Sequence, residues 1–238
     1  MSRGREELLR QVPLFRDLRS EQLAALIGHS IPQSASKGSV IIAEGETEPT
    51  FLVFVMSGRA NVIISDTSGR EIILAVIEAP GIAGEIGVLD GLRRSATVRA
   101  DAASEYMRIG ARPFLDCIRG DATFAEKVAK HVASTLRRAN EHLRVISTFE
   151  ARDRVVWCVS VLAVQYGRRQ DGDLVLEHHL MHRDIGDMTS LSRETATRMM
   201  RELEDEGCIT QQRDRLVVHV ERINKYLDRW PWLADPRL

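Results

Sequence analysis

The segment from Asp121 to Glu150 restricts the fold most, because it contains neither proline nor glycine and has apolar or small residues at alternating spacings of three and four. This spacing is the a/d pattern of a helix that packs along its length against another helix. The seam residues are Ala125, Val128, Val132, Thr135, Ala139, His142, Ile146 and Phe149, and Leu136 and Leu143 widen the stripe. We therefore expect one long helix that divides the chain into two parts.

Two interpretations of this helix are open, an internal core helix and the seam of a parallel homodimer. We favour the homodimer, because a helix of this length overhangs a small barrel. The middle of the seam is small or polar at Thr135, Ala139 and His142, so a ligand or a register device fits there. We expect His142 to be a packed or water-bonded histidine rather than a haem ligand or a pH sensor.

The residues before the long helix predict a short helical start and then a small antiparallel barrel or sandwich. Apolar spacing predicts helices over Glu6–Leu14 and Ser20–Ile27, with Ser20 as the N-cap of the second helix. From Lys37 onward, short β-branched runs alternate with turn elements. The predicted strands are Val40–Ile42, Phe51–Met56, Ala60–Ile64, Glu71–Ile77, Thr97–Ala100 and Tyr106–Ile109.

The residues after the long helix predict a winged helix-turn-helix domain. Ser192 is placed as the N-cap of its second helix, which runs to Glu206 and stops at Gly207. The order of elements is a helix over Val155–Tyr166, a turn over Arg168–Asp173, a strand over Leu174–Glu177, a short helix with Ile185 and Met188 buried, the turn Thr189–Leu191, the Ser192 helix, and a hairpin over Cys208–Val220. In such domains the second helix enters the major groove of DNA.

The outer face of the Ser192 helix carries side chains suited to DNA. Arg193 and Arg198 can each donate two hydrogen bonds to guanine, and Glu194 can accept one from cytosine. Ser192, Thr195 and Arg201 are better placed for phosphates, which fix register without reading sequence. The alternative is a solvated helix face with internal ion pairs. Acidic residues gather at the far end of the helix and basic ones at its start, which opposes the helix dipole and favours DNA binding.

Asp184 to Arg198, with the sequence DIGDMTSLSRETATR, closely resembles the recognition segment of the cyclic AMP receptor protein/FNR (CRP/FNR) family of bacterial regulators. The likeness extends over nearly the whole chain, in the order β-roll, dimer helix and winged domain. The resemblance implies that Arg193, Glu194 and Arg198 read bases in a TGTGA-like half-site, repeated as a palindrome for a two-fold dimer. Ser190 departs from the family, which usually has glycine at this position.

A glycine-rich stretch, Gly81 to Gly87, precedes the stretch Arg93 to Thr97. Backbone N–H groups of such a turn can approach an anion, and a guanidinium and a hydroxyl can clamp a phosphate. Within a β-roll, it looks like the phosphate-binding cassette of cyclic-nucleotide domains. That likeness implies a cyclic nucleotide ligand, cyclic AMP first, with the 2′-hydroxyl on Glu85 and the phosphate on Arg94 and Ser95. The candidate ligand-binding residues are Gly84, Glu85, Ile86, Arg94, Ser95 and Asn140.

The dimer helix departs from the nucleotide-responsive branch of the family. That branch supplies an arginine, a threonine and a small polar residue around the glutamate and the base, and the matching positions here are Thr135, Ala139 and Asn140. Only Asn140 keeps a polar group for adenine. A second hypothesis therefore stays open, in which the turn keeps the shape of the barrel and the DNA-binding regulator needs no nucleotide or responds to another signal.

Composition excludes several other classes of protein. A formal net charge of -1 argues against a protein that coats nucleic acid indiscriminately. The three cysteines are far apart, so we expect no zinc or iron–sulfur site, and we assign no metal to Glu177, His178, His179 and His182. With no apolar leader at the start and no long apolar run, we expect a cytoplasmic protein that does not span a membrane. No catalytic arrangement emerges, so we expect no enzyme.

The predicted fold class is α+β: an N-terminal antiparallel β-roll of the cyclic-nucleotide-binding, jelly-roll type, a long dimerisation helix, and a C-terminal winged helix-turn-helix. The predicted ranges are 1–118 for the β-roll, 119–150 for the helix, 151–221 for the winged domain and 222–238 for a C-terminal extension. The expected partners are a palindromic double-stranded DNA operator, a second copy of the chain bound through residues 121–150, and RNA polymerase. A cyclic-nucleotide module without DNA binding is disfavoured by the Ser192 helix.

Overall fold

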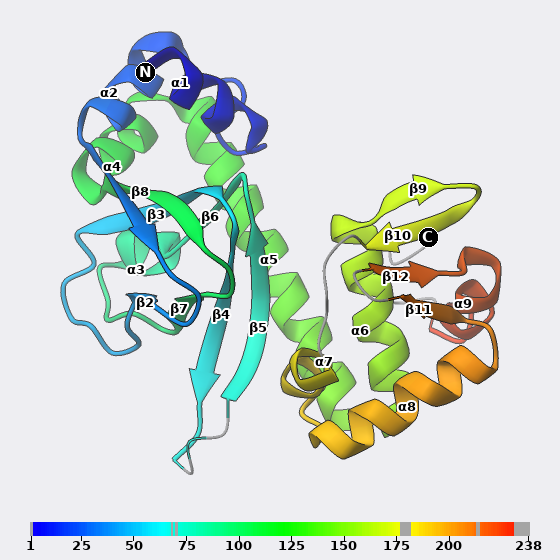
Figure 1. Ribbon diagram of the computed structural model, residues 1–238. Coiled ribbons are helices and arrows are strands. Elements are labelled where there is room, and N and C mark those ends of the chain that lie inside the picture. The colour runs from blue at the N-terminus through cyan, green and yellow to red at the C-terminus, as the bar shows by residue number, and fades with distance from the viewer. Residues whose placement is uncertain (1, 68, 70, 177–181, 213–214, 231–238) are drawn as a thin grey trace. The chain divides into compact units, whose positions relative to one another are not determined.

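The computed structural model describes residues 2–67, 69, 71–176, 182–212 and 215–230. The chain forms two compact units, Met1–Arg138 and Ala139–Leu238, and the division falls within helix α5 (Ala122–Thr148). Figure 1 labels the elements of each unit. The predicted boundaries at residues 118, 150 and 221 divide the chain differently and stay predictions.

The first unit is built from two four-stranded antiparallel sheets with helices at one end (Figure 1). One sheet has the strand order β1-β8-β3-β6 and the other β2-β7-β4-β5. The strands are β1 (Ser30–Ala35), β2 (Val40–Ile42), β3 (Phe51–Ser57), β4 (Arg59–Ser65), β5 (Glu71–Glu78), β6 (Gly81–Ala83), β7 (Thr97–Ala100) and β8 (Ser104–Gly110). The helices are α1 (Ser2–Gln11), α2 (Ser20–Gly28), α3 (Glu85–Asp90), α4 (Ala111–Gly120) and the first part of α5.

Alternation along β3 and β8 gives this unit two cores, because successive side chains point to opposite faces of a strand. Leu52 and Phe54 of β3 pack with Met107 of β8 against α1, α2, α4 and the start of α5. Val53 and Val55 face the other sheet, in the core between the two sheets. The first core continues onto α5 through Phe124 and Val128. The predicted β-roll is confirmed, and helices cover the outer face of one of its sheets.

Four elements of this unit were not predicted: β1, β6, α3 and α4. Strand β1 contains Pro32, and it lies at the edge of its sheet, where a proline is tolerated because no ladder hydrogen bond is lost. Strand β6 and helix α3 are too short to show a period. The predicted N-cap of α2 is wrong by one residue, since Arg19 precedes the helix and its backbone N–H donates to Gln22 Oε1 at 2.9 Å.

Helix α5 is confirmed as one long helix, but the predicted seam is partly wrong. Val128 is buried in the core of the first unit, and His142 is 7% exposed against its own chain in the second. Leu136 and Leu143, predicted only to widen the stripe, are instead 61% and 59% exposed. The exposed apolar stripe of α5 consists of Val132, Leu136, Ala139 and Leu143.

The second unit is a helix-turn-helix with a four-stranded sheet of order β11-β12-β10-β9. Its elements are α6 (Ala151–Tyr166), β9 (Arg168–Gln170), β10 (Asp173–Leu176), α7 (His182–Thr189), α8 (Arg193–Asp205), β11 (Ile209–Gln212), β12 (Arg215–Val218) and α9 (Val220–Leu227). The predicted turn over Arg168–Asp173 is wrong, because β9 pairs with β10. The turn is only Asp171-Gly172, with φ of 52° and 91°, the left-handed pair that closes a two-residue hairpin.

The turn between α7 and α8 is tight. Leu191 N donates to Gly186 O at 2.9 Å, and a Cβ on Gly186 would lie 3.0 Å from Leu191 O, so the two helices meet where only glycine fits without a shift. Ser190, which stands where the family usually has glycine, has a φ of 56°. This left-handed conformation costs an L-residue roughly 1–2 kcal/mol.

A chain of hydrogen bonds ties the sheet of the second unit to α9. His219 Nδ1 lies 2.7 Å from Asp173 Oδ2, and its Nε2 lies 2.8 Å from Thr210 Oγ1. Asp173 Oδ1 also accepts from Val220 N at 3.1 Å, at the start of α9. The sequence does not reveal this Asp–His–Thr chain of hydrogen bonds, because Asp173 lies far along the chain from Thr210 and His219. The chain of bonds fixes the end of β12 on β10 and β11.

Candidate nucleic-acid interface and effector site

Helix α8 is held by caps at both ends. Ser192 Oγ accepts from Thr195 N at 3.2 Å, as predicted for the N-cap. At the other end Gly207 has a φ of 66°, and the N–H groups of Gly207 and Cys208 donate to Glu204 O and Leu203 O, each at 2.8 Å. These two bonds form a Schellman motif. The buried face consists of Ala196, Met199, Met200 and Leu203.

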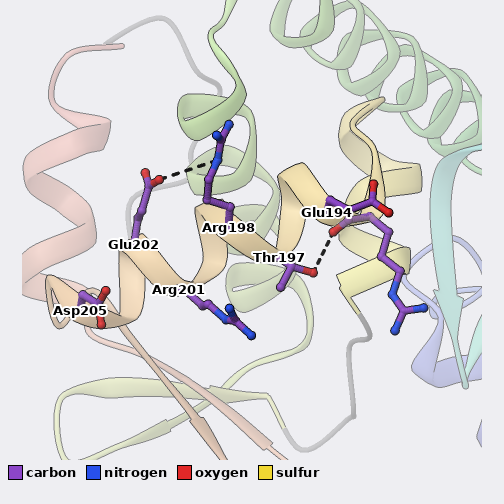
Figure 2. A pocket seen from close by; sticks show the side chains of 7 residues that line it. Glu194, Thr197, Arg198, Arg201, Glu202 and Asp205 are labelled. Atoms are coloured by element: carbon purple, nitrogen blue, oxygen red, sulfur yellow. Dashed lines mark hydrogen bonds and ion pairs between the residues drawn. The ribbon is translucent and has the colours of Figure 1, made fainter.

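The opposite face of α8 is exposed and forms a shallow hollow of about 560 Å³. The hollow is lined by Arg193, Glu194, Thr197, Arg198, Arg201, Glu202 and Asp205. Figure 2 shows Arg198 and Arg201 extending from α8 in different directions. Among the described residues, the side chains of Arg193, Glu194 and Arg201 form no hydrogen bond or ion pair, so they are available to a ligand.

Arg198 is the one predicted base-reading residue with an ion pair among the described residues. Its Nε lies 4.0 Å from Glu202 Oε1, and the Arg198 side chain is 69% exposed (Figure 2). An exposed i,i+4 pair contributes only about 0.3–0.5 kcal/mol. A guanine contact is worth roughly 1–3 kcal/mol of discrimination, so this pair does not prevent Arg198 from turning to a base.

The acidic residues at the far end of α8 have structural partners. Glu204 accepts from Gln211 N at 2.9 Å and so ties the helix to β11. Glu206 contacts Arg152 of α6 and Tyr226 of α9. The hydrogen bond from Tyr226 and, to a smaller extent, contact with Arg152 lower the pKa of Glu206. The reversed charge order along α8 therefore has a second cause, the anchoring of its end, which the sequence pattern did not reveal.

The glycine-rich turn of the first unit is closed over Arg94. Arg94 is 2% exposed, and its guanidinium donates to Gly84 O at 2.7 Å and to Phe51 O at 2.5 Å. Burial lowers the pKa of Arg94. Gly84 has a φ of 82°, and a Cβ there would lie 2.5 Å from Ile42 Cδ1, so the turn requires glycine. The structure thus brings Gly84 and Arg94 together, as predicted.

The carboxylate beside this turn is paired with a residue that the sequence analysis missed. Glu85 is 7% exposed, and its Oε1 lies 3.2 Å from His131 Nε2 on α5. His131 lies one helical turn before Thr135, so the two residues share a face of the helix. Thr135 is the position matched to the arginine of the nucleotide-responsive branch. The spacing of four residues from Thr135 is the sequence signal that could have identified His131.

The remaining predicted ligand residues lie at the surface. Ser95 is exposed and Ile86 is 39% exposed, both adjoining the turn in the first unit. Asn140 is exposed on α5 and belongs to the second unit, so its contact with adenine stays a prediction.

His142 joins α5 to the helix-turn-helix within the second unit. Its Nε2 lies 2.7 Å from Met188 O at the end of α7, and its ring is stacked on Trp157 of α6 with 5.2 Å between ring centroids. It is a packed histidine, as predicted. Burial lowers the pKa of His142, and the hydrogen bond to Met188 O raises it by less.

This burial gives a pH prediction for stability. A histidine whose folded pKa is depressed takes up its proton more readily in the unfolded chain, so stability is full above the unfolded pKa of about 6.5 and falls as pH drops below it. We expect the free energy of unfolding to fall by at most about 1.4 kcal/mol per pH unit in that range. Denaturant titrations followed by tryptophan fluorescence, at pH 7.5 and below 6.5, measure this slope. His142→Gln should remove it.

Two models of protein families match the chain. The cyclic nucleotide-binding domain matches residues 32–121 and the Crp-like helix-turn-helix domain matches residues 154–225. The two matches occur in the order that the fold requires. The chain belongs to the CRP/FNR family. This CRP/FNR family member is a DNA-binding transcription regulator with a cyclic nucleotide-binding domain.

Relatives of known function and solved structures agree. The "cAMP-activated global transcriptional regulator CRP" of Salmonella typhimurium is 28% identical over 185 residues, 77% of this chain and 87% of the relative. A "CRP-like cAMP-activated global transcriptional regulator" of Mycobacterium tuberculosis is 23% identical over 86% of this chain and 91% of its own length. FixK2 from Bradyrhizobium japonicum matches in fold with a TM-score of 0.74 at 20% identity, covering 83% of this chain and 96% of FixK2.

None of the helices among the described residues combines the length and apolar character needed to cross a membrane. The described residues also contain no group of three or more metal-ligating side chains. Residues 177–181, which hold part of the Glu177 and histidine cluster, and the side chain of His182 lie outside the described residues. Cys117, Cys158 and Cys208 are buried free thiols.

Proposed function

We propose that the protein is a homodimeric regulator that reads a palindromic, TGTGA-like DNA site through α8 and is controlled by a cyclic nucleotide, cyclic AMP first, bound in the β-roll. The observation that carries the DNA half is the exposed face of α8. It presents Arg193, Glu194 and Arg198 to solvent on a helix whose caps and buried face are satisfied. Ser192, Thr195 and Arg201 are assigned to phosphates.

Dimerisation through α5 is supported by its exposed apolar stripe. Leu136 and Leu143 are seven residues apart, the repeat of a coiled-coil seam, and each is more than half exposed. Two copies joined along this stripe would bring two recognition helices onto one duplex, which a palindromic operator requires. RNA polymerase is the expected partner where the regulator activates.

The ligand half is supported by the matching cyclic nucleotide-binding domain and by the joining of the turn to α5. Glu85, assigned to the ribose hydroxyl, is already held by His131 of α5. A ligand hydroxyl that donates to Glu85 would compete with the Glu85–His131 contact, which joins the turn to the dimer helix. Because a ligand shifts an equilibrium only through contacts that differ between states, this bond is a route for the response.

The alternative is a regulator that needs no nucleotide. The observation that favours it is the burial of Arg94, which donates to two carbonyls of its own chain and is only 2% exposed. These two bonds use only part of its four Nη hydrogens. Isothermal calorimetry with cyclic AMP and cyclic GMP decides between the two. We expect binding to the wild type and loss of the heat in Arg94→Ala.

Ser95→Ala is a second variant for that measurement, because Ser95 is also assigned to the phosphate and, being exposed, should be replaceable with little effect on the fold. A weaker heat in Ser95→Ala with an unchanged melting temperature supports a phosphate site. Absence of heat with either nucleotide in the wild type favours the ligand-independent regulator. Selection of bound sequences from a random DNA pool tests the DNA half separately, and recovery of no palindromic motif would contradict it.

A further inference from the structure

Arg108 is a second arginine beside the effector turn. It lies on β8 opposite Val53 of β3. Its neighbours Met107 and Ile109 belong to the core under the helices, whereas Tyr106 belongs to the core between the two sheets. Because side chains alternate along a strand, Arg108 lies on the same face as Tyr106, toward the interior of the β-roll.

Phe51 brings the two arginines together. The guanidinium carbon of Arg108 lies 4.3 Å from the centre of the Phe51 ring, and that of Arg94 lies 5.0 Å from the same centre. Phe51 itself packs on the core between the sheets, and its carbonyl holds Arg94. One aromatic ring therefore positions both cations.

Both guanidinium groups carry an unpaired buried donor. Nε of Arg94 and Nε of Arg108 are buried without a hydrogen-bond partner. Within the described part of the chain, the Arg108 side chain has no hydrogen bond or ion pair; it contacts the Phe51 ring and repels Arg94 electrostatically. A buried donor without a partner costs free energy, and native structures keep such groups where something else satisfies them. Two unpaired donors beside one turn indicate a missing acceptor with several oxygens.

We propose that Arg108 is a second phosphate-binding residue of the effector site and that it acts together with Arg94 on an organic phosphate. This inference rests on the ligand half of the proposed function, but Arg108 is not among the residues that the sequence assigned to the ligand. The two guanidinium groups would each take a separate oxygen, since charge-assisted bonds to phosphate are the strongest that arginine makes. Arg108 disfavours the charged form of Arg94, whereas Glu46 and Glu85 favour it. An anion bound between the two guanidinium groups would reduce the repulsion between them.

Arg108→Met tests the proposal, because methionine keeps much of the packing on Phe51 and removes the charge. We expect affinity for cyclic AMP, cyclic GMP and inorganic pyrophosphate, measured by calorimetry at matched ionic strength, to fall about 10- to 100-fold. The melting temperature without ligand should be unchanged or higher, because an uncompensated charge has been removed. Arg112→Met on α4, whose side chain is 91% exposed, is the control and should behave as the wild type.

The pyrophosphate measurement separates this proposal from the proposed function. If the wild type binds pyrophosphate in an Arg108-dependent way but neither cyclic nucleotide, the cyclic-nucleotide assignment fails and the Arg108 assignment stands. Equal affinity of Arg108→Met and wild type for every probe overturns the proposal, as does a wild type that binds none of the three. If Arg108→Met melts several degrees lower, Arg108→Lys decides: a variant that restores melting but not affinity supports the phosphate role, and one that restores neither overturns it.

Discussion

Arg193→Ala is expected to lower the affinity of the dimer for its selected DNA site by about 2–6 kcal/mol, because each lost bidentate contact costs roughly 1–3 kcal/mol and the dimer makes the contact twice. The loss should be specific to sequence. Preference at one base pair of each half-site should relax, while affinity for unrelated DNA changes little. Fluorescence anisotropy with the selected site and with single-position variants measures both effects.

Arg201→Ala is the matched comparison on the same face of α8. It should weaken binding to all sequences alike and reduce the slope of affinity against salt by about one ion per protomer. Neither side chain has a partner in the described part of its own chain, so both variants should unfold within about 0.5 kcal/mol of the wild type. Equal losses on every sequence for both variants would contradict the assignment of Arg193 to bases and Arg201 to phosphates.

Leu136→Glu combined with Leu143→Glu is expected to give a monomer. Burying a leucine side chain contributes about 1.5–3 kcal/mol, and each substitution acts twice in a two-fold seam, where it also places like charges together. Light scattering after size-exclusion chromatography measures the mass. Affinity for the palindromic site should fall about 10²- to 10⁴-fold, because the second half-site no longer benefits from its tethered neighbour.

Leu92→Glu is the matched control for the seam. Leu92 is 63% exposed, close to Leu136 and Leu143, but it lies in the loop after α3. It should leave the mass and the DNA affinity unchanged. If the Leu136→Glu, Leu143→Glu double variant remains dimeric, dimerisation through this stripe of α5 is contradicted.

Elements with a regular apolar period, a β-branched run or a local capping signal could be predicted from the sequence. Helix α5 and the α7–α8 pair follow from apolar spacing and from caps such as Ser192 and Gly207, because these signals are local. Strand β1 was hidden by Pro32, whose tolerance depends on a place at a sheet edge that only the complete fold supplies. The division of the α5 stripe between core and solvent also depends on which elements pack against it.

The candidate sites show the same limit. The exposed face of α8 was predictable, because a capped amphipathic helix leaves a definite set of residues outside. The partners of Glu85 and Arg94 were not, since His131 and Phe51 are distant in sequence and contact them only through tertiary packing. Arg108 was missed for the same reason, because alternation on β8 shows its face but not what lies opposite.

The left-handed Ser190 makes the α7–α8 turn a site where this regulator could be made more robust by one substitution. Glycine accepts a φ of 56° without the steric penalty of a Cβ, so Ser190→Gly relieves the turn in the folded state while making the unfolded chain freer. The two effects oppose each other. The change in the free energy of unfolding of Ser190→Gly therefore measures the difference between the backbone strain at Ser190 and the entropy that glycine adds to the unfolded chain.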